Sequence, residues 1–131
     1  MKYAIVVSEF NEMITNRMLE ECLRGFAEQE IEPIVLKVPG AAEIPLALQD
    51  LINKEKPDAL VALGCVIKGE TEHYDAICQM ISQGIMDLML KHHVPIVFEV
   101  LMTDSFQKAE DRIDKAYHAA FVASKMTRLI S

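Results

Sequence analysis

The sequence predicts an α/β protein, a three-layer α/β/α sandwich around a four-stranded parallel sheet. Short apolar segments rich in β-branched residues alternate with longer segments in which apolar residues recur every three or four positions. Strands that are joined through helices form parallel sheets with helices on both faces. With 131 residues, 51% of them hydrophobic, the chain is long enough for one domain, residues 1–131, and too short for two.

The first half of the chain contains two predicted strand–helix units. The first strand is Tyr3–Val7, and the loop Ser8–Asn11 follows it. Apolar residues at helical spacing then predict a helix: Ile14, Met18, Leu19, Cys22, Leu23 and Phe26. The second strand is Ile34–Val38, which Pro39-Gly40 ends, and the next helix carries Ile44, Leu48, Leu51 and Ile52. Pro45 is compatible with that helix because it lies in the first turn.

The second half repeats the pattern. Residues 59–67 form a nearly continuous apolar run, as expected of a strand that is covered on both faces. A helical pattern from Ile77 to Leu90 follows, and then a fourth strand at Val94–Leu101. Thr103-Asp104-Ser105 offers N-cap residues for a last helix that runs towards the chain end. Its apolar stripe is Ala109, Ile113, Ala116, Ala120, Ala123 and Met126.

Composition and charge narrow the class of protein. A formal charge of −7 and a pI near 5.0 argue against a nucleic-acid binder, which would show a basic face. The mean hydropathy of +0.16 is high for so small a domain and indicates an apolar interface. No apolar run approaches the ~20 residues of a membrane span, and the first residues read as a strand rather than a signal peptide.

The three cysteines predict a cytoplasmic protein with reduced thiols. Cys22, Cys65 and Cys78 are odd in number and form no C-x-x-C pair. We expect them to be inert residues of the core.

In parallel α/β sheets, ligands bind beyond the carboxyl ends of the strands. We therefore expect the loops after the four strands to meet at one edge. These loops contain Phe10 and Asn11, residues 40–43, residues 69–73, and residues 102–104.

The loop after the third strand offers two kinds of chemistry. Gly69-Glu70-Thr71 precedes a helix, so its amides and the threonine hydroxyl could bind a phosphate or simply cap the helix. His73 is either an acid/base group near neutral pH or a surface residue. No Walker A or G-x-G-x-x-G motif predicts a nucleotide cofactor, and no histidine spacing predicts a metal site.

Three further residues are candidates for ligand binding. Phe10 could stack on a flat heterocycle or pack against the first helix. Glu43 could accept hydrogen bonds from sugar-like hydroxyls or complement a helix dipole. Arg112 could pair with a phosphate or remain solvated.

Three strings together resemble the 6,7-dimethyl-8-ribityllumazine synthase family. They are Ser8-Glu-Phe-Asn11, Val38-Pro-Gly-Ala-Ala-Glu-Ile-Pro45 and Gly64-Cys-Val-Ile-Lys-Gly-Glu-Thr-Glu-His73. The resemblance spans nearly the whole chain in the right order and spacing. It implies a flavodoxin-like fold of the lumazine synthase type.

The resemblance also implies a reaction and an assembly. The family condenses 5-amino-6-(D-ribitylamino)uracil with 3,4-dihydroxy-2-butanone 4-phosphate, giving the lumazine, phosphate and water in riboflavin biosynthesis. It uses no metal and no organic cofactor. Its members form pentamers, and some assemble further into decamers or sixty-subunit shells, with active sites between adjacent subunits.

Site roles follow from the resemblance position by position. His73 would transfer protons, and Arg112 would pair with the phosphate. Phe98 of a neighbouring subunit would close the pocket. The remaining predicted substrate-binding residues are Phe10 and Asn11 at the pyrimidine, Ala41, Ala42 and Glu43 at the ribityl chain, Cys65, Val66 and Ile67 at the uracil, and Glu70 and Thr71 at the phosphate.

Two departures from the family pattern leave alternatives open. Glu70 replaces a small residue beside the expected phosphate, and the lysine-rich segment after Arg112 retains only Lys115. One alternative is a catalytically weak paralogue that binds lumazine or flavin, or serves as a scaffold. The other is an archaeal-type riboflavin synthase. The retained Gly-x-Thr-x-His motif favours a lumazine synthase over this second alternative.

Overall fold

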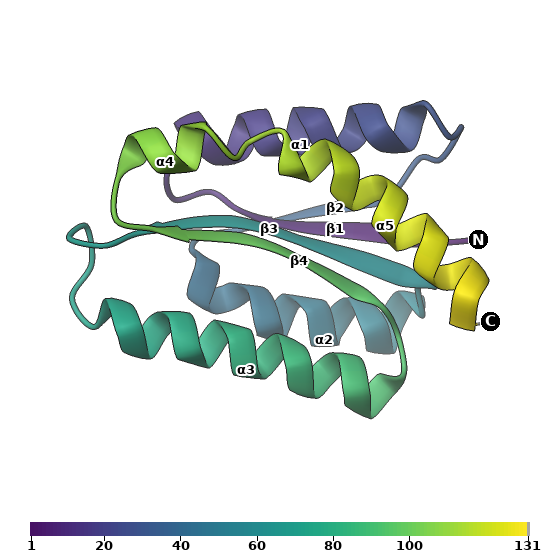
Figure 1. Cartoon of the computed structure of the whole chain (residues 1–131). Coiled ribbons are helices and arrows are strands. Elements are labelled where there is room, and N and C mark those ends of the chain that lie inside the picture. Colours follow the sequence, from purple (N-terminus) through teal and green to yellow (C-terminus); the bar gives the residue numbers. More distant parts are fainter. Residues whose placement is uncertain (131) are drawn as a thin grey trace.

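The computed structural model describes residues 1–130 and has three layers (Figure 1). A parallel four-stranded sheet in the order β2-β1-β3-β4 forms the middle layer. The strands are β1 (Tyr3–Ser8), β2 (Ile34–Val38), β3 (Ala59–Ile67) and β4 (Ile96–Thr103). The helices are α1 (Glu12–Ala27), η1 (Ala41–Glu43), α2 (Ile44–Glu55), α3 (Tyr74–His92), α4 (Phe106–Glu110) and α5 (Lys115–Ile130). The predicted α/β class with a parallel sheet is confirmed.

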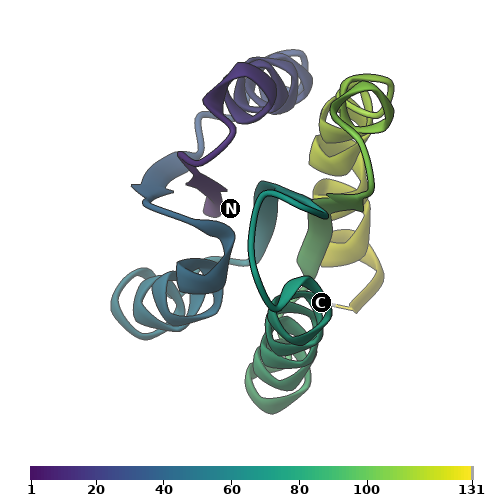
Figure 2. The ribbon, with the colours of Figure 1, turned by 90° about the vertical axis from the view of Figure 1, so that its left-hand side faces the viewer.

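Each face of the sheet has its own core, and Figure 2 shows the two helical layers end-on. Side chains that alternate along β1 and β3 pack either beneath α1 and α5 or beneath α2 and α3. All six residues of β1 and all nine of β3 are buried, which explains the continuous apolar run of the third strand. Each large aliphatic or aromatic side chain that is fully buried contributes about 1.5–3 kcal/mol.

α1 and α5 cross closely on one face of the sheet. A Cβ atom added at Gly25 would lie 2.6 Å from the carbonyl oxygen of Tyr117 and 2.9 Å from the Cβ of Ala120. The glycine therefore allows the two helices to approach. Arg24, beside it, lies 4.0 Å over the ring of Tyr117, and Glu28 accepts a hydrogen bond from the hydroxyl of that tyrosine.

The prediction of one continuous last helix is wrong, because the structure has two helices there, α4 and α5. Ser105 caps α4 as expected, accepting a hydrogen bond from the amide of Lys108 at 3.2 Å. Residues 111–114 then form turns in which amides bond three residues back, for example Ile113 to Glu110 and Lys115 to Arg112. This break keeps the Ile113 side chain buried while Arg112 stays exposed.

β4 also lies later than predicted, at Ile96–Thr103 instead of Val94–Leu101. Its pairing with β3 extends as far as the Ile67–Thr103 pair, whereas Val94 still contacts α3 through a hydrogen bond to Met89. As the last strand in the order, β4 has an open outer edge, and Phe98 on it is 38% exposed.

Two of the three cysteines are buried as the sequence predicts. Cys22 and Cys65 are buried free thiols, as predicted, but Cys78 is only partly buried. Burial raises the pKa of Cys22 to about 12 and that of Cys65 to about 11, so both are uncharged at neutral pH. Within residues 1–130, no helix combines the length and apolarity needed to cross a bilayer.

Candidate active site

A cavity of about 340 Å³ lies beyond the carboxyl ends of β1, β2 and β3. Three of the four predicted loops contribute to it. Its lining consists of Phe10, Gly40, Ala41, Ala42, Cys65, Val66, Ile67, Glu70, Thr71 and Ile77. A volume of this size is in the range of small-molecule sites.

The β1–α1 loop is fixed by backbone bonds and one side chain. The amides of Glu9 and Phe10 donate to the carbonyls of Val38 at 2.7 Å and Pro39 at 3.0 Å. Asn11 has a left-handed backbone (φ 63°), and its Nδ2 donates to the carbonyl of Cys65 at 3.1 Å. Phe10 remains 56% exposed, which favours stacking on a ligand over packing against α1.

Small side chains form the wall that follows β2. Ala41 is buried, Ala42 is partly buried, and the short helix η1 turns the chain into α2. Glu43 is exposed and is not part of the lining. Its Oε1 lies 3.0 Å from the position that a Cβ atom on Gly40 would take, so the carboxylate folds back over the glycine at the rim.

The loop between β3 and α3 supplies the polar end of the cavity. Gly69 has φ +98°, and the amide of Glu70 donates to the carbonyl of Ile67 at 3.2 Å. The hydroxyl of Thr71 donates to the carbonyl of Glu72 at 2.9 Å. α3 begins only at Tyr74, so the amides of its first turn have no partner within the helix and are available to an anion.

His73 occupies the N-cap position of α3 with a left-handed backbone (φ 62°). Its carbonyl accepts a hydrogen bond from the amide of Ile77 at 2.9 Å, and its side chain is exposed. The imidazole is not part of the cavity lining, although the neighbouring Glu70 and Thr71 are. The proton-transfer role of His73 stays a prediction.

The fourth loop is not part of the cavity lining, and besides Glu43 and His73 neither are the predicted residues Asn11, Phe98 and Arg112. Residues 102–104 are tied to the β3–α3 loop by a bond from the amide of Lys68 to the carbonyl of Thr103 at 2.8 Å, yet none of them lines the cavity. Asp104 is paired with Lys108 at 2.8 Å, which lowers the pKa of the carboxyl. Phe98 on β4 and Arg112 after α4 also lie outside the lining.

Two lining residues, Gly40 and Ile77, were not among the predicted site residues, although Gly40 lies in a predicted loop. Ile77 lies at helical spacing from the core residues of α3, so its sequence position predicts a core residue. It lies at the end of α3 that faces the cavity. Within residues 1–130, no three His, Cys, Asp or Glu side chains are grouped so that they could hold a metal ion.

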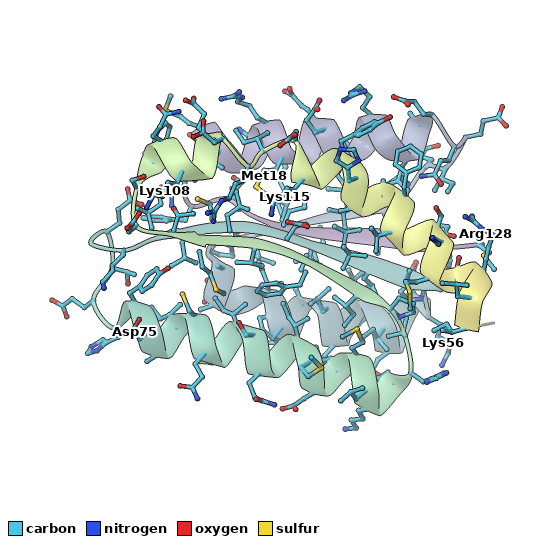
Figure 3. The ribbon with its side chains drawn as sticks, viewed as in Figure 1. Met18, Lys56, Asp75, Lys108, Lys115 and Arg128 are labelled. Atoms are coloured by element: carbon cyan, nitrogen blue, oxygen red, sulfur yellow. The ribbon has the colours of Figure 1, made fainter. Side chains whose placement is uncertain are left out.

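A second cavity, of about 420 Å³, lies at the opposite end of the sheet. Its lining includes Lys56, His92 and Thr127, and none of the predicted site loops. Figure 3 labels Lys56 and Arg128 at that end, and Asp75 and Lys108 at the end of the candidate site.

A parallel α/β sheet with a ligand-sized cavity at the carboxyl ends of its strands is typical of doubly wound α/β proteins that bind small molecules. Comparison with known proteins is more specific. The model of the family described as 6,7-dimethyl-8-ribityllumazine synthase matches residues 1–131. A 6,7-dimethyl-8-ribityllumazine synthase of Limosilactobacillus reuteri (strain DSM 20016) is 39% identical over an alignment of 130 residues, and the match covers 97% of this chain and 86% of the relative. The chain belongs to the 6,7-dimethyl-8-ribityllumazine synthase family.

Proposed function

We propose that this protein is a lumazine synthase of riboflavin biosynthesis. It condenses 5-amino-6-(D-ribitylamino)uracil with 3,4-dihydroxy-2-butanone 4-phosphate and releases 6,7-dimethyl-8-ribityllumazine, phosphate and water. The observation that carries the proposal is one cavity lined by all three family strings, in a chain that matches the family over its full length.

The uracil substrate occupies the apolar part of the cavity. Its ring stacks on the exposed ring of Phe10. Backbone groups of Cys65, Val66 and Ile67, at the end of β3, contact the edge of the uracil ring. The ribityl chain runs along Ala41 and Ala42 towards Glu43, whose carboxylate accepts hydroxyl hydrogen bonds at the rim. Asn11 acts at the pyrimidine end, where its amide holds the Phe10 loop to β3.

The phosphorylated substrate lies at the polar end. The hydroxyl of Thr71 and free amides between Thr71 and the first turn of α3 bind its phosphate, beside Glu70, whose own amide is bonded to the carbonyl of Ile67. Schiff-base formation, loss of phosphate and ring closure need proton transfers, and His73 at the mouth carries them. Positioning two reactive molecules can lower the barrier by several kcal/mol, and one acid/base group typically adds about 10²–10⁴-fold.

A neighbouring subunit completes the site. Phe98 and Arg112 lie on the β4 side, outside the cavity of their own subunit, and both are exposed. In a pentamer they would reach the cavity of the next subunit, where Phe98 closes over the ring and Arg112 pairs with the phosphate. Exposed apolar side chains on α3, among them Met80, Met86 and Leu90, supply contact surface for such an assembly.

The enzyme works in the cytoplasm, where its free thiols stay reduced. It acts as a single domain, residues 1–131, and without a metal or organic cofactor. The proposed assembly is a pentamer, which could assemble further into a decamer or a shell of sixty subunits.

One observation favours a second candidate, a lumazine- or flavin-binding paralogue with weak turnover. Glu70 is part of the cavity lining, and its negative charge opposes a phosphate unless the carboxylate turns outward. The experiment is to incubate the purified protein with both substrates and follow lumazine absorbance and phosphate release. Formation of both above the uncatalysed rate supports the synthase, whereas tight lumazine binding without turnover supports the paralogue.

A further inference from the structure

The wall of the cavity that follows β2 continues directly into α2. Ala41 and Ala42 of η1 line the cavity and are called the η1 wall below. α2 begins at Ile44, immediately after η1, and the amide of Ile44 donates a hydrogen bond to the carbonyl of Ala41. Because the η1 wall is one short turn bonded to the start of α2, its position depends on how the first residues of α2 are packed.

The first turn of α2 packs against a glycine of α3. A Cβ atom added at Gly84 would lie 3.1 Å from the Cβ of Pro45 and 3.2 Å from its Cγ. Both separations are shorter than the ~3.5–4.0 Å of an ordinary contact between carbon atoms. A proline ring is rigid, so it cannot turn away from an added methyl group. Glycine weakens the interior of a helix relative to alanine, and the close approach of Pro45 accounts for its presence here.

Ile44 prevents the start of α2 from moving towards the sheet. Its side chain is fully buried in the core beneath α2 and α3. Its Cδ1 lies 3.2 Å from the position that a Cβ atom on Gly64 of β3 would take, so little space remains between this side chain and the strand. A methyl group added at Gly84 would therefore push α2 and α3 apart.

α3 carries a second lining segment, whose distance from the η1 wall depends on this contact. Ile77 lines the cavity and lies about two helical turns before Gly84, on the same face of α3. α2 and α3 lie side by side below the sheet in Figure 1, and η1 contacts α3 as well. The close approach of the two helices at Gly84 therefore sets the distance between Ile77 and the η1 wall.

We propose that Gly84 is a positioning residue that determines specificity for the ribityl chain, although it does not line the cavity. The inference rests on the proposed function, in which the ribityl chain runs along the η1 wall. The contact between Gly84 and Pro45 holds this wall, and the Glu43 carboxylate beside it, at the distance at which they meet the chain and its hydroxyl groups. The heterocycle lies against Phe10 and the end of β3, which do not belong to this helix contact.

The test measures the dissociation constants of two ligands, 6,7-dimethyl-8-ribityllumazine and the same lumazine with a methyl group in place of the ribityl chain. Gly84→Ala is expected to weaken binding of the ribityl compound about fivefold, because displacing positioned groups by a fraction of an ångström weakens their contacts. Binding of the methyl compound should stay within about twofold of that of the unchanged protein.

Two further variants show whether the contact itself is the cause. Pro45→Gly removes both carbon atoms that the added methyl group would meet, so the double variant Gly84→Ala with Pro45→Gly should bind the ribityl compound within about twofold of the unchanged protein. Gly25→Ala is the matched control, because Gly25 is also a helical glycine in close contact but lies on the opposite face of the sheet. It should leave both dissociation constants unchanged.

The outcomes separate this inference from the proposed function. An unchanged affinity of Gly84→Ala for the ribityl compound, an equal loss for both ligands, or a double variant as weak as Gly84→Ala would overturn the inference while lumazine synthesis stands. If Gly84→Ala does not fold, Pro45→Gly alters the same contact from α2 and should change the affinity for the ribityl compound only. A protein that binds both lumazines as predicted but forms no lumazine from the substrates contradicts the proposed function alone. If neither lumazine binds the unchanged protein, both fail.

Discussion

The amide of Asn11 donates a hydrogen bond to the carbonyl of Cys65 at 3.1 Å and so joins the loop after β1 to the end of β3. This bond spans 54 residues of sequence and connects two walls of the cavity. The exposed ring of Phe10 is held beside β3 because its neighbour is anchored there.

Asn11→Ala should weaken both the loop and the site. It removes the bond to Cys65 and places an alanine at φ 63°, which costs about 1–2 kcal/mol for the backbone alone. We expect a loss of about 2–3 kcal/mol in urea unfolding and a higher KM for the uracil substrate. Asn11→Gly is the matched variant, because it keeps the backbone and removes only the bond; equal stability of the two variants would contradict the strain at this position.

Gly25→Ala should lower stability without altering the site. The added methyl meets the Tyr117 carbonyl at 2.6 Å, so α1 and α5 must separate, which typically costs about 1–3 kcal/mol. Thermal unfolding measures the loss, and the KM values of the folded protein should not change. A KM that rises for either substrate would show that the α1–α5 contact controls the cavity.

Glu99→Gln should stabilise the protein at neutral pH. Burial raises the pKa of the Glu99 carboxyl in the folded protein. Such a group contributes stability at a pH below its pKa in the unfolded chain, and that contribution is lost as the pH rises through its pKa in the folded protein. Glutamine does not ionise, so the variant does not lose this stability as the pH rises. The free energy of unfolding at pH 7 should therefore increase relative to the unchanged protein, and the difference should shrink towards pH 4. A less stable variant at pH 7 would mean that Lys115 more than offsets the burial of the carboxylate.

The strands, the helices and the three loops of the cavity could be predicted from the sequence because they depend on local signals. Apolar periodicity marks each element, and the parallel topology brings the loops together. The division of α4 from α5 could not be predicted, since the apolar stripe continues through Ile113 and only the turn bonds around residues 111–114 reveal the break.

The contacts that individual side chains make could not be predicted from the sequence either. A sequence does not indicate that the Asn11 amide bonds the carbonyl of Cys65 or that the Glu43 carboxylate folds over Gly40. Phe98 was predicted through family resemblance alone, whereas for Arg112 the residues themselves left pairing with a phosphate and solvation as alternatives. Both residues lie outside the cavity lining of their own subunit, as expected if they act at the cavity of a neighbouring subunit.

Mixing two variants tests whether the site is shared between subunits. His73→Ala should lower kcat by roughly 10²-fold without abolishing turnover, and Arg112→Ala should mainly raise the KM for the butanone phosphate. Subunits refolded together in equal amounts should regain roughly a quarter of the native sites, because a native His73 then meets a native Arg112 of a neighbour. Activity equal to the mean of the separate variants would place both residues in one subunit's site.

The most direct test is the reaction itself. The purified protein is mixed with 5-amino-6-(D-ribitylamino)uracil and 3,4-dihydroxy-2-butanone 4-phosphate, and lumazine absorbance and free phosphate are recorded together. We predict that both rise in equal amounts, well above the rate without protein. Phosphate and lumazine at the uncatalysed rate, with the protein folded and assembled, would contradict the assignment as a lumazine synthase.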